Sequence, residues 1–291
     1  MLAGAAFGVP VYGTHAHSWV MSFPDEQSAF DAYADVFPQS TVLLIDTYDT
    51  LAHGLKHAIA TARKMEARGG KLAAVRLDSG DLAYLSKACR RGLDDAGLRY
   101  VQILVSSDVD EYVIRDLKAQ GAPIDVYGVG TRLATAFQEP ALNGVYKLAA
   151  IQDGPQWRPT LKLSSNPAKT TIPGRKQIWR WERDGRFLGD CLALEDEGPP
   201  ARMIHPEIDF QSTDLPSEEL RPLLETRIDQ GRRTCPADPL PVSRQRVQAE
   251  LDRLPEEHQR LSNPHVYRVG LSEKLWKLRR DLIDQWSNDS R

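Results

Sequence analysis

One pattern, repeated between residues 41 and 131, most constrains the fold of this chain. A short apolar run at 42–45 ends in small polar residues, and a helix pattern with apolar residues at helical spacing follows from Leu51. The same pattern recurs at the apolar runs 72–75, 101–105 and 124–127, with the helices between them ending near Gly69, Gly97 and Gly121. Strands that alternate with helices at this spacing predict right-handed βαβ units and a parallel sheet.

The polar clusters of this region lie where each predicted strand ends and its helix begins. They are DTYDT at 46–50, RLDSGD at 76–81, SSD at 106–108 and GVGT at 128–131. Barrels and open α/β sheets both place their binding sites at this edge of the sheet. The periodicity alone does not decide between a barrel and an open sheet.

The pattern changes after Gly144. Strands without intervening helices are predicted at 145–151, 159–163, 176–181 and 187–194, and prolines and charges dominate from Glu195 onward. Helices are expected near 217–226 and 243–254, followed by a last helix with one apolar face formed by Leu271, Leu275, Leu278, Leu282 and Trp286. We therefore expect one domain at 1–195 and a helical, Pro-rich region at 196–291.

The composition argues against several classes of protein. A net charge of −3 over 291 residues gives no electrostatic reason to expect a nucleic acid or an acidic membrane as partner. Three cysteines, Cys89, Cys191 and Cys235, form no close pair and leave an odd count. This argues against a disulfide framework and a zinc cluster, and favours the reducing cytoplasm.

The first 24 residues carry no Asp, Glu, Lys or Arg. They lack the basic region of a signal peptide, and Gly8, Pro10 and His15 interrupt the apolar stretch that a membrane helix needs. We expect a buried strand and loop, so that the chain starts inside a fold.

The segment GTHAHSW at 13–19 carries two histidines. If it is extended, His15 and His17 face the same way, because side chains in a strand repeat every two residues. A metal pair would need further ligands, and no other His or Cys has the required spacing. A nucleophile needs a neutral imidazole, which an ordinary histidine pKa of about 6.5 allows at pH 7. A buried, hydrogen-bonded role is the alternative for either histidine.

Arg76 and Asp78 share one face of the strand that ends in RLDSGD. An arginine can bind a carboxylate or phosphate with two parallel hydrogen bonds, and an aspartate can accept from sugar hydroxyls. Ser79 and Gly80 are expected to open a helix, where free N–H groups attract an anion. An Arg–Asp salt bridge beside an ordinary helix cap is the alternative.

Two glycines follow the last predicted strand. Gly128, Gly130 and Thr131 would let the backbone approach a phosphate and surround it with N–H donors, although a plain turn is the alternative. Ser106 and Asp108 invite a similar interpretation, with a helix cap as the alternative. Anion donors, a carboxylate clamp and a reactive histidine on one edge together fit a phosphorylated sugar substrate.

These motifs, in this order and spacing, resemble nicotinate phosphoribosyltransferases. The resemblance is carried by residues 13–19, 45–50, 76–81 and 128–131, and continues through 140–148 and 169–176. It is close over residues 2–195 and less distinctive beyond. It implies the α/β class: an irregular α/β barrel of the type II phosphoribosyltransferase kind, incomplete here, with a C-terminal extension, in a protein that forms a homodimer.

The resemblance also implies an activity. Members of the family join nicotinate to phosphoribosyl pyrophosphate, giving nicotinate mononucleotide and pyrophosphate for NAD biosynthesis, with ATP hydrolysis and Mg²⁺ assisting. The phosphorylated histidine of the family falls on His17, the nicotinate contacts on Thr14 and Arg76, and a contact to the ribose or its metal on Asp78. The phosphate site and the other expected substrate contacts fall on Gly128, Gly130, Thr131, Ser79, Gly80, Ser106 and Asp108.

The match departs from the family at its start. Family members carry an N-terminal domain, and an arginine-containing strand and a Gly-Thr-Ser turn come directly before the segment that begins here at Leu2. The sequence therefore predicts a truncated chain with little activity of its own. The alternatives are a non-catalytic remnant, a subunit that needs a separate N-terminal domain, and a nicotinamide phosphoribosyltransferase. A quinolinate enzyme would need more basic residues for its dicarboxylate.

Overall fold

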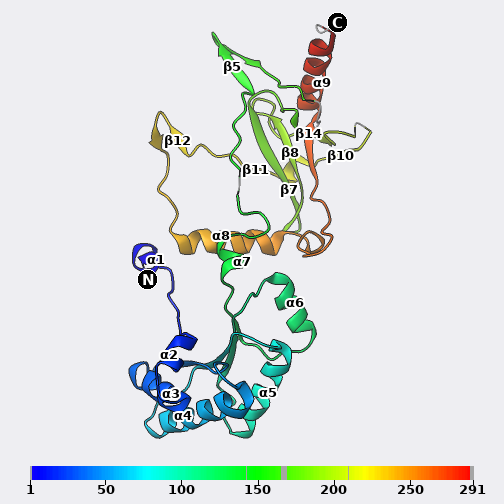
Figure 1. The fold of residues 1–291 in the computed structure, drawn as a ribbon. Coiled ribbons are helices and arrows are strands. Elements are labelled where there is room, and N and C mark those ends of the chain that lie inside the picture. Colours follow the sequence, from blue (N-terminus) through cyan, green and yellow to red (C-terminus); the bar gives the residue numbers. More distant parts are fainter. Residues whose placement is uncertain (1, 142, 165–168, 209, 289–291) are drawn as a thin grey trace. The chain divides into compact units, whose positions relative to one another are not determined.

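The computed structural model describes residues 2–141, 143–164, 169–208 and 210–288, so that Met1 and Leu142 of the segments above lie outside the described residues. The chain forms two compact units, Met1–Asn143 (unit 1) and Gly144–Arg291 (unit 2), whose elements are labelled in Figure 1. This division comes earlier in the chain than the boundary expected after residue 195. The reason is that β7 (Lys176–Arg183) and β8 (Arg186–Leu194) share a sheet with strands from later in the chain.

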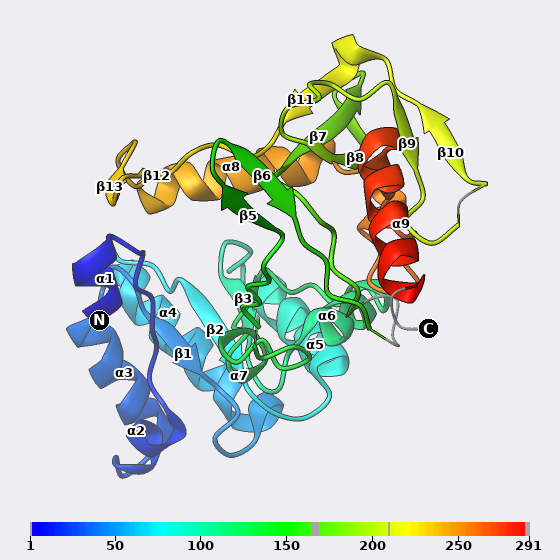
Figure 2. The same cartoon turned by 90° about the horizontal axis from the view of Figure 1, so that it is seen from above.

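Unit 2 is built on a six-stranded sheet of order β10-β9-β14-β8-β7-β11. The remaining strands are β9 (Arg202–Ile204), β10 (Ser212–Asp214), β11 (Leu220–Pro222) and β14 (Val269–Ser272). All neighbours are antiparallel except β8 and β14, which are parallel. Helix α9 (Glu273–Asn288) packs against β8, β9 and β14, and Figure 2 shows it beside these strands.

The described part of unit 2 also holds two hairpins, one long helix and two short 3₁₀ turns. The hairpins are β5 (Ala150–Asp153) with β6 (Gln156–Pro159) and β12 (Ile228–Asp229) with β13 (Arg232–Arg233), and the helix is α8 (Leu240–Arg253). The 3₁₀ turns lie at Ser217–Glu219 and Glu256–His258. The strands predicted near 176–181 and 187–194 and the helix near 243–254 are confirmed. The strand expected at 145–151 is present only from Ala150, and the one expected at 159–163 ends at Pro159.

The helix expected near 217–226 is wrong. A 3₁₀ turn at Ser217–Glu219 leads directly into β11, which pairs with β7. Pro222 in the middle of the expected helix lacks the N–H that a helix interior requires, so the segment extends along the sheet instead. The last helix is confirmed, but Leu271 of its expected apolar face lies in β14.

Unit 1 carries the predicted parallel sheet. Its order is β1-β2-β3-β4, formed by β1 (Val42–Leu44), β2 (Ala74–Leu77), β3 (Gln102–Val105) and β4 (Val126–Tyr127). All neighbouring pairs are parallel, as βαβ units require. The connecting helices are α4 (Leu55–Ala67) after a π-helical turn at Thr50–Gly54, α5 (Leu82–Asp95) and α6 (Glu111–Ala119).

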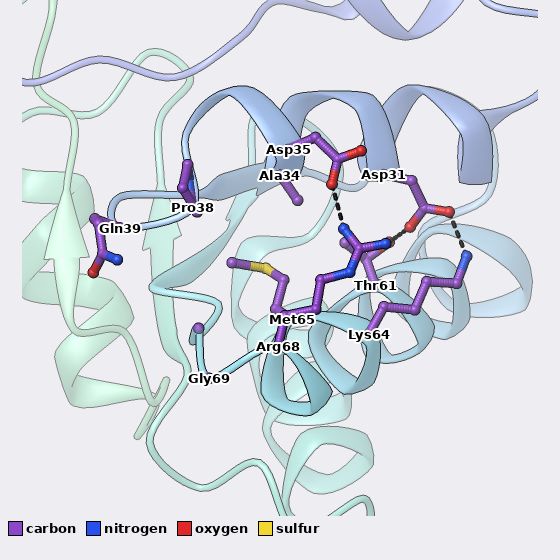
Figure 3. A pocket seen from close by; sticks show the side chains of 11 residues that line it. Asp31, Ala34, Asp35, Pro38, Gln39, Thr61, Lys64, Met65, Arg68 and Gly69 are labelled. Atoms are coloured by element: carbon purple, nitrogen blue, oxygen red, sulfur yellow. Dashed lines mark hydrogen bonds and ion pairs between the residues drawn. The ribbon is translucent and has the colours of Figure 1, made fainter.

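Helix α3 (Glu26–Val36) precedes the first strand and packs beside α4. Asp31 and Asp35 of α3 form ion pairs with Lys64 of α4 and with Arg68, which directly follows α4, and these pairs border a groove of ≈ 380 Å³ (Figure 3). The groove ends at the turns that precede β1 and β2. It therefore lies at the N-terminal ends of the strands, opposite the polar clusters.

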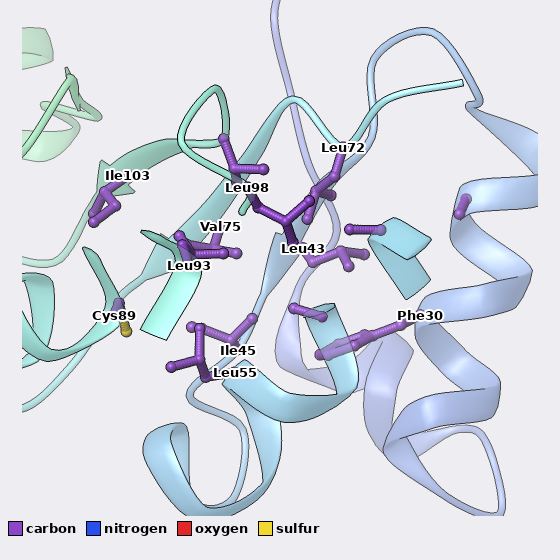
Figure 4. Packing of buried hydrophobic residues seen from close by; sticks show 14 of the residues in the cluster. Phe30, Leu43, Ile45, Leu55, Leu72, Val75, Cys89, Leu93, Leu98 and Ile103 are labelled. Carbon is purple, nitrogen blue, oxygen red and sulfur yellow. The ribbon is translucent and has the colours of Figure 1, made fainter. Parts of the chain in front are cut away.

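The core of unit 1 forms between the sheet and its helices (Figure 4). Leu43, Val75 and Ile103 of three adjacent strands are completely buried, as is Phe30 of α3. The chain passes very close to the end of β1 at Gly54, where an added Cβ would lie 1.9 Å from the Ile45 carbonyl oxygen. Glycine is required there, because any side chain would push the turn before α4 away from the end of β1.

The opening segment is not the buried strand that its lack of charge suggested. Leu2–Phe7 forms the short helix α1, no regular structure follows until α2 (His17–Met21), and Leu2 and Tyr12 are 83% and 93% exposed. Gly8, Pro10 and Gly13 explain this result, because glycine and proline disfavour strands. His15 and His17 consequently do not share a strand face.

Two further findings concern the cysteine thiols and the helices. Cys89, Cys191 and Cys235 are all free thiols, and burial raises the pKa of Cys89 and of Cys191 to about 12. In the part of the chain that the structure describes, no helix is long and apolar enough to cross a membrane.

Candidate functional site

The carboxyl ends of the four parallel strands bring most of the predicted polar residues of unit 1 together. Asp46 follows β1, Asp78 follows β2, Ser106 follows β3 and Gly128 follows β4. Hydrogen bonds join the first three strand ends, and an added Cβ on Gly128 would lie 3.4 Å from the Ser106 Cβ. The prediction that these clusters meet at one edge of the sheet is confirmed.

Arg76 is held by three partners from three parts of unit 1. Its Nε donates to Ser106 Oγ at 2.7 Å, one terminal nitrogen donates to Asp78 Oδ1 at 3.0 Å, and the other donates to the His15 carbonyl oxygen at 3.3 Å. Ser106 Oγ in turn donates to Asp78 Oδ1. The salt bridge named as the alternative is therefore present, within a network that also fixes the plane of the guanidinium.

Asp78 is ionised at neutral pH. Partial burial acts to raise its pKa, but hydrogen bonds from Ser106 and Arg76 outweigh this effect and leave the pKa below its ordinary value. The carboxylate is 30% exposed, so one side of it stays open to a ligand.

Asp46 is a residue whose role the sequence did not reveal. Its Oδ2 accepts from the Asp78 backbone N–H at 2.8 Å and from the Ser79 hydroxyl at 2.7 Å. Its side chain is only 2% exposed, and its Oδ1 is buried without a hydrogen-bond partner among the described residues. A buried carboxylate oxygen without a partner is costly, and such atoms require an explanation. The position of Asp46 at a strand end was the available signal.

His17 lies against this unpartnered oxygen. Its Nε2 is 4.0 Å from Asp46 Oδ1 and 3.8 Å from Asp78 Oδ2, and its Nδ1 is 3.0 Å from the Thr47 hydroxyl. The side chain is 38% exposed, so a ligand can reach it. His17 thus combines accessibility with carboxylates on one side of the ring and a hydroxyl on the other.

His15 has the opposite environment, although it is only two residues away. It is 6% exposed, and burial lowers its pKa below 6.5. Its ring lies edge-on to Tyr33 with centroids 4.7 Å apart, and its Nε2 accepts from the Leu44 backbone N–H. The buried, hydrogen-bonded alternative therefore describes His15 but not His17.

Ser79 and Gly80 do not cap the following helix. The N-cap of α5 is Asp81, whose carboxylate accepts from the Tyr84 N–H at 2.9 Å, while the Ser79 hydroxyl supports Asp46. Gly80 has φ +77°, a left-handed conformation that turns the chain between strand and helix. Their substrate contacts stay a prediction, and the expected position at the start of the helix is wrong by two residues.

Gly128, Gly130 and Thr131 form the loop between β4 and the short helix α7 (Thr131–Ala134), and all three are exposed. Asp108 is exposed in the loop before α6, whose N-cap is Asp110 and not Asp108. Thr14 lies beside the edge of β1, and its hydroxyl donates to the Val42 carbonyl at 2.8 Å. Substrate contacts of these residues stay predictions.

The residues at this edge suit a metal that arrives with its substrate. Within the described residues, no three His, Cys, Asp or Glu side chains gather as a metal site. Asp46 and Asp78 nevertheless offer carboxylate oxygens, which Mg²⁺ prefers, and Mg²⁺ bound to phosphates commonly needs only one or two protein carboxylates.

Comparisons with known proteins show which family the chain resembles. Residues 175–279 match the family model described as nicotinate phosphoribosyltransferase C-terminal domain. The chain is 44% identical over 280 residues to the nicotinate phosphoribosyltransferase of Bacillus subtilis (strain 168), covering 94% of this chain and 57% of that protein. It is 34% identical to the human protein of the same name, covering 96% of this chain and 62% of that protein.

Solved structures show the same relationship. The crystal structure of human nicotinic acid phosphoribosyltransferase matches with a TM-score of 0.78 and 30% identity, covering 97% of this chain and 63% of that chain. A nicotinate-nucleotide pyrophosphorylase from Pyrococcus furiosus, at 20% identity and a TM-score of 0.61, shares the fold. The expected α/β fold class is confirmed, and the chain spans just over half the length of the curated relatives that it matches.

Proposed function

We propose, because the chain resembles nicotinate phosphoribosyltransferases over 94% or more of its length, that unit 1 carries the catalytic edge of an enzyme that joins nicotinate to phosphoribosyl pyrophosphate. The products would be nicotinate mononucleotide and pyrophosphate. The observation that carries this proposal is the accessible His17 ring, held between the Thr47 hydroxyl and the carboxylates of Asp46 and Asp78.

The arrangement favours Nδ1 of His17 as the nucleophile. The carboxylates near Nε2 favour a proton on that nitrogen, which leaves the Nδ1 lone pair to accept from Thr47. His17 would then attack the γ-phosphorus of ATP through Nδ1. A P–N bond forms as the bond to the bridging oxygen breaks, and ADP departs. Carboxylates that stabilise the resulting imidazolium act as in other histidine-dependent sites.

Arg76 is suited to bind the carboxylate of nicotinate. Three of its five N–H groups are used within the described residues, so two remain for a ligand. An arginine–carboxylate pair is strong because two parallel, charge-assisted hydrogen bonds can form. The same geometry disfavours nicotinamide, which carries no negative charge.

Asp78 would bind the ribose ring of phosphoribosyl pyrophosphate. Its ionised and partly exposed carboxylate can accept from ribose hydroxyls and stabilise the positive charge that develops on the ring as pyrophosphate leaves. Mg²⁺ carried by the phosphates would neutralise their charge and could be held by Asp78. Backbone N–H groups at Gly128, Gly130 and Thr131 would receive the 5′-phosphate.

Unit 2, which holds most of the matched C-terminal domain, would complete the enzyme together with the region that this chain does not cover. We propose that the complete protein is a homodimer of the cytoplasm, a location that its three free thiols support. A non-catalytic subunit that needs a partner chain is the second candidate.

The test is incubation with ATP labelled at the γ-phosphate. His17 should take up acid-labile label, and His17→Asn should not, while the exposed His53→Asn serves as control. Label that persists in His17→Asn contradicts the nucleophile. Nicotinate mononucleotide formation is then measured for this chain alone and after addition of the region that precedes it in the relatives. Near-normal turnover of the chain alone would contradict the need for a partner.

A further inference from the structure

The free edge of β1 is closed by side chains. β1 is the first strand of its sheet and has β2 on one side only. On that side the Thr41 carbonyl accepts from Ala73 N–H and the Ile45 N–H donates to the Arg76 carbonyl. The Val42 carbonyl and the Leu44 N–H point to the opposite edge, where a further strand would normally bind them.

Two consecutive side chains take the place of that strand. The Thr14 hydroxyl donates to the Val42 carbonyl at 2.8 Å, and His15 Nε2 accepts from the Leu44 N–H at 3.1 Å. Those are the two groups that one residue of a neighbouring parallel strand would bind. Leu44 is completely buried, so without His15 its N–H would lose its partner in a place that water does not reach.

The contact determines the tautomer of His15. Since the Leu44 N–H can only donate, Nε2 must carry a lone pair, and the proton lies on Nδ1, which is 3.4 Å from the Ala16 carbonyl oxygen. Phe30 and Tyr33 of α3 surround the ring, with centroids 6.2 and 4.7 Å away. Packing and hydrogen bonding thus hold His15 in one orientation.

The positions of two residues of the proposed catalytic edge, Arg76 and His17, depend on this orientation of His15. The carbonyl oxygen of His15 accepts from Arg76, and His17, the first residue of α2, follows only two residues later. The partners of His17, Asp46 and Thr47, continue directly from β1. One strand therefore carries both the histidine segment and the side chains that His17 faces.

We propose that Thr14 and His15 form a clip on the edge of β1, and that His15 is a positioning residue for His17 and Arg76. The clip substitutes side chains for a neighbouring strand, so it sets the distance between His17 and its carboxylates, and the buried His15 acts in it without touching substrate. The effect on catalysis rests on the proposed function, whereas the clip itself does not.

The decisive comparison is His15→Gln against His15→Leu. Glutamine can place its Oε1 near the position of Nε2 and accept from Leu44, whereas leucine keeps the volume but offers no acceptor. We expect amide exchange at Leu44 to be about tenfold faster or more in His15→Leu, and close to wild type in His15→Gln, because an unpaired buried N–H is costly. The exposed His53→Leu is the matched control.

A second measurement follows the His17 ring by ¹⁵N NMR as a function of pH. We expect the His17 titration to shift in His15→Leu and to be restored in His15→Gln. If His17 takes up label from ATP, the rate of uptake should fall at least tenfold in His15→Leu and stay close to wild type in His15→Gln. An unchanged His17 titration and unchanged Leu44 exchange in a folded His15→Leu would overturn the inference.

If His15→Leu does not fold, the clip is tested in the wild-type protein by the tautomer of His15. The ring ¹⁵N shifts of His15 should show a proton on Nδ1 and a bare Nε2, and a proton on Nε2 would overturn the clip. Absence of label in every variant, with the exchange and titration effects intact, would contradict the phosphorylation proposal alone.

Discussion

Each unit contains an arginine that binds carboxylate oxygens, and the two arginines differ in how many carboxylates they meet. In unit 2, Arg180 donates to both oxygens of Asp190 at 2.9 and 3.0 Å and to Glu250 at 2.9 Å. In unit 1, Arg76 meets one carboxylate oxygen, a hydroxyl and a carbonyl. Each guanidinium uses three N–H groups in these bonds, but two carboxylates balance the charge of Arg180 and only one balances the charge of Arg76.

The surroundings of the two arginines differ in the same way. Hydrogen bonds from Arg180 to Asp190 raise the pKa of Arg180 further above its ordinary value, and both side chains are less than one-fifth exposed. Beside Arg76, a buried oxygen of Asp46 lacks a partner and Asp78 is 30% exposed. A buried cluster whose charges balance stabilises a fold, while a cluster with an unpartnered acceptor and a partly exposed carboxylate is suited to bind a ligand.

The largest expected effect on stability concerns Gly54. Its turn lies beside the cluster of Arg76, Asp78 and Asp46, which we call the unit 1 cluster. Gly54→Ala would place a methyl group 1.9 Å from the Ile45 carbonyl oxygen, next to Asp46. Because that contact is backbone, the turn before α4 must move. We expect a loss of about 3 kcal/mol or more in the free energy of unfolding, measured by urea denaturation. Gly144→Ala, with no atom near the added Cβ, is the control. Equal stability of the two variants would contradict the close approach.

The second prediction tests the two arginines directly. Arg180→Met leaves the largely buried Asp190 carboxylate without its cation, although the Tyr267 hydroxyl still donates to it at 3.2 Å, so we expect a loss of about 3 kcal/mol in stability. Arg76→Met should cost about 1 kcal/mol, because Asp78 keeps the Ser106 hydroxyl and is partly solvated. Nicotinate affinity should fall at least tenfold in Arg76→Met, measured by calorimetry on the chain together with the part of its relatives that it does not align with.

A double variant sharpens the same comparison. Arg180→Met combined with Asp190→Leu removes both charges and should recover part of the lost stability, since no buried carboxylate is left alone. Should Arg76→Met destabilise the protein as much as Arg180→Met, and leave nicotinate affinity unchanged, the distinction between the two clusters does not hold.

The third prediction concerns strain beside the unit 1 cluster. Ser107 has φ +98°, and its carbonyl accepts from the Val109 N–H at 2.7 Å, which closes a tight turn directly after Ser106. Glycine adopts this backbone without strain, so Ser107→Gly should raise stability by about 0.5–1 kcal/mol. Ser79→Gly, at a residue without positive φ, should not. A lower melting temperature for Ser107→Gly would count against stored strain.

The smallest effect is a pH dependence. The pKa of His15 is lowered in the folded protein, mainly by burial, while the unfolded chain keeps a value near 6.5. Between these two values the unfolded chain binds more protons. The contribution of His15 to the free energy of unfolding is therefore complete above about pH 6.5. It decreases as the pH falls towards the lowered pKa of His15 in the folded protein. His15→Gln should show a flatter stability profile in that window, measured by denaturation at several pH values. An identical slope in both proteins would exclude the effect.

Much of unit 1 could be predicted from the chain alone. Apolar runs at 42–45, 72–75, 101–105 and 124–127 identified all four parallel strands, because burial on both faces demands continuous apolar residues. The glycines after each helix marked the helix ends. The strands of unit 2 were harder to predict from the sequence. Short antiparallel strands such as β11 form only where a distant segment of the chain pairs with them.

The amino-acid sequence by itself determined the parallel sheet of unit 1 and the edge where its polar residues gather, because periodicity and the handedness of βαβ connections leave few other arrangements. Only the tertiary structure decided what those residues do there. His15 and His17 are indistinguishable by residue type and spacing, yet one binds the Leu44 N–H inside the core and the other faces Asp46 and Asp78. Those partners lie 29 to 61 residues away along the chain, and their burial and hydrogen bonding exist only once the four strand ends meet.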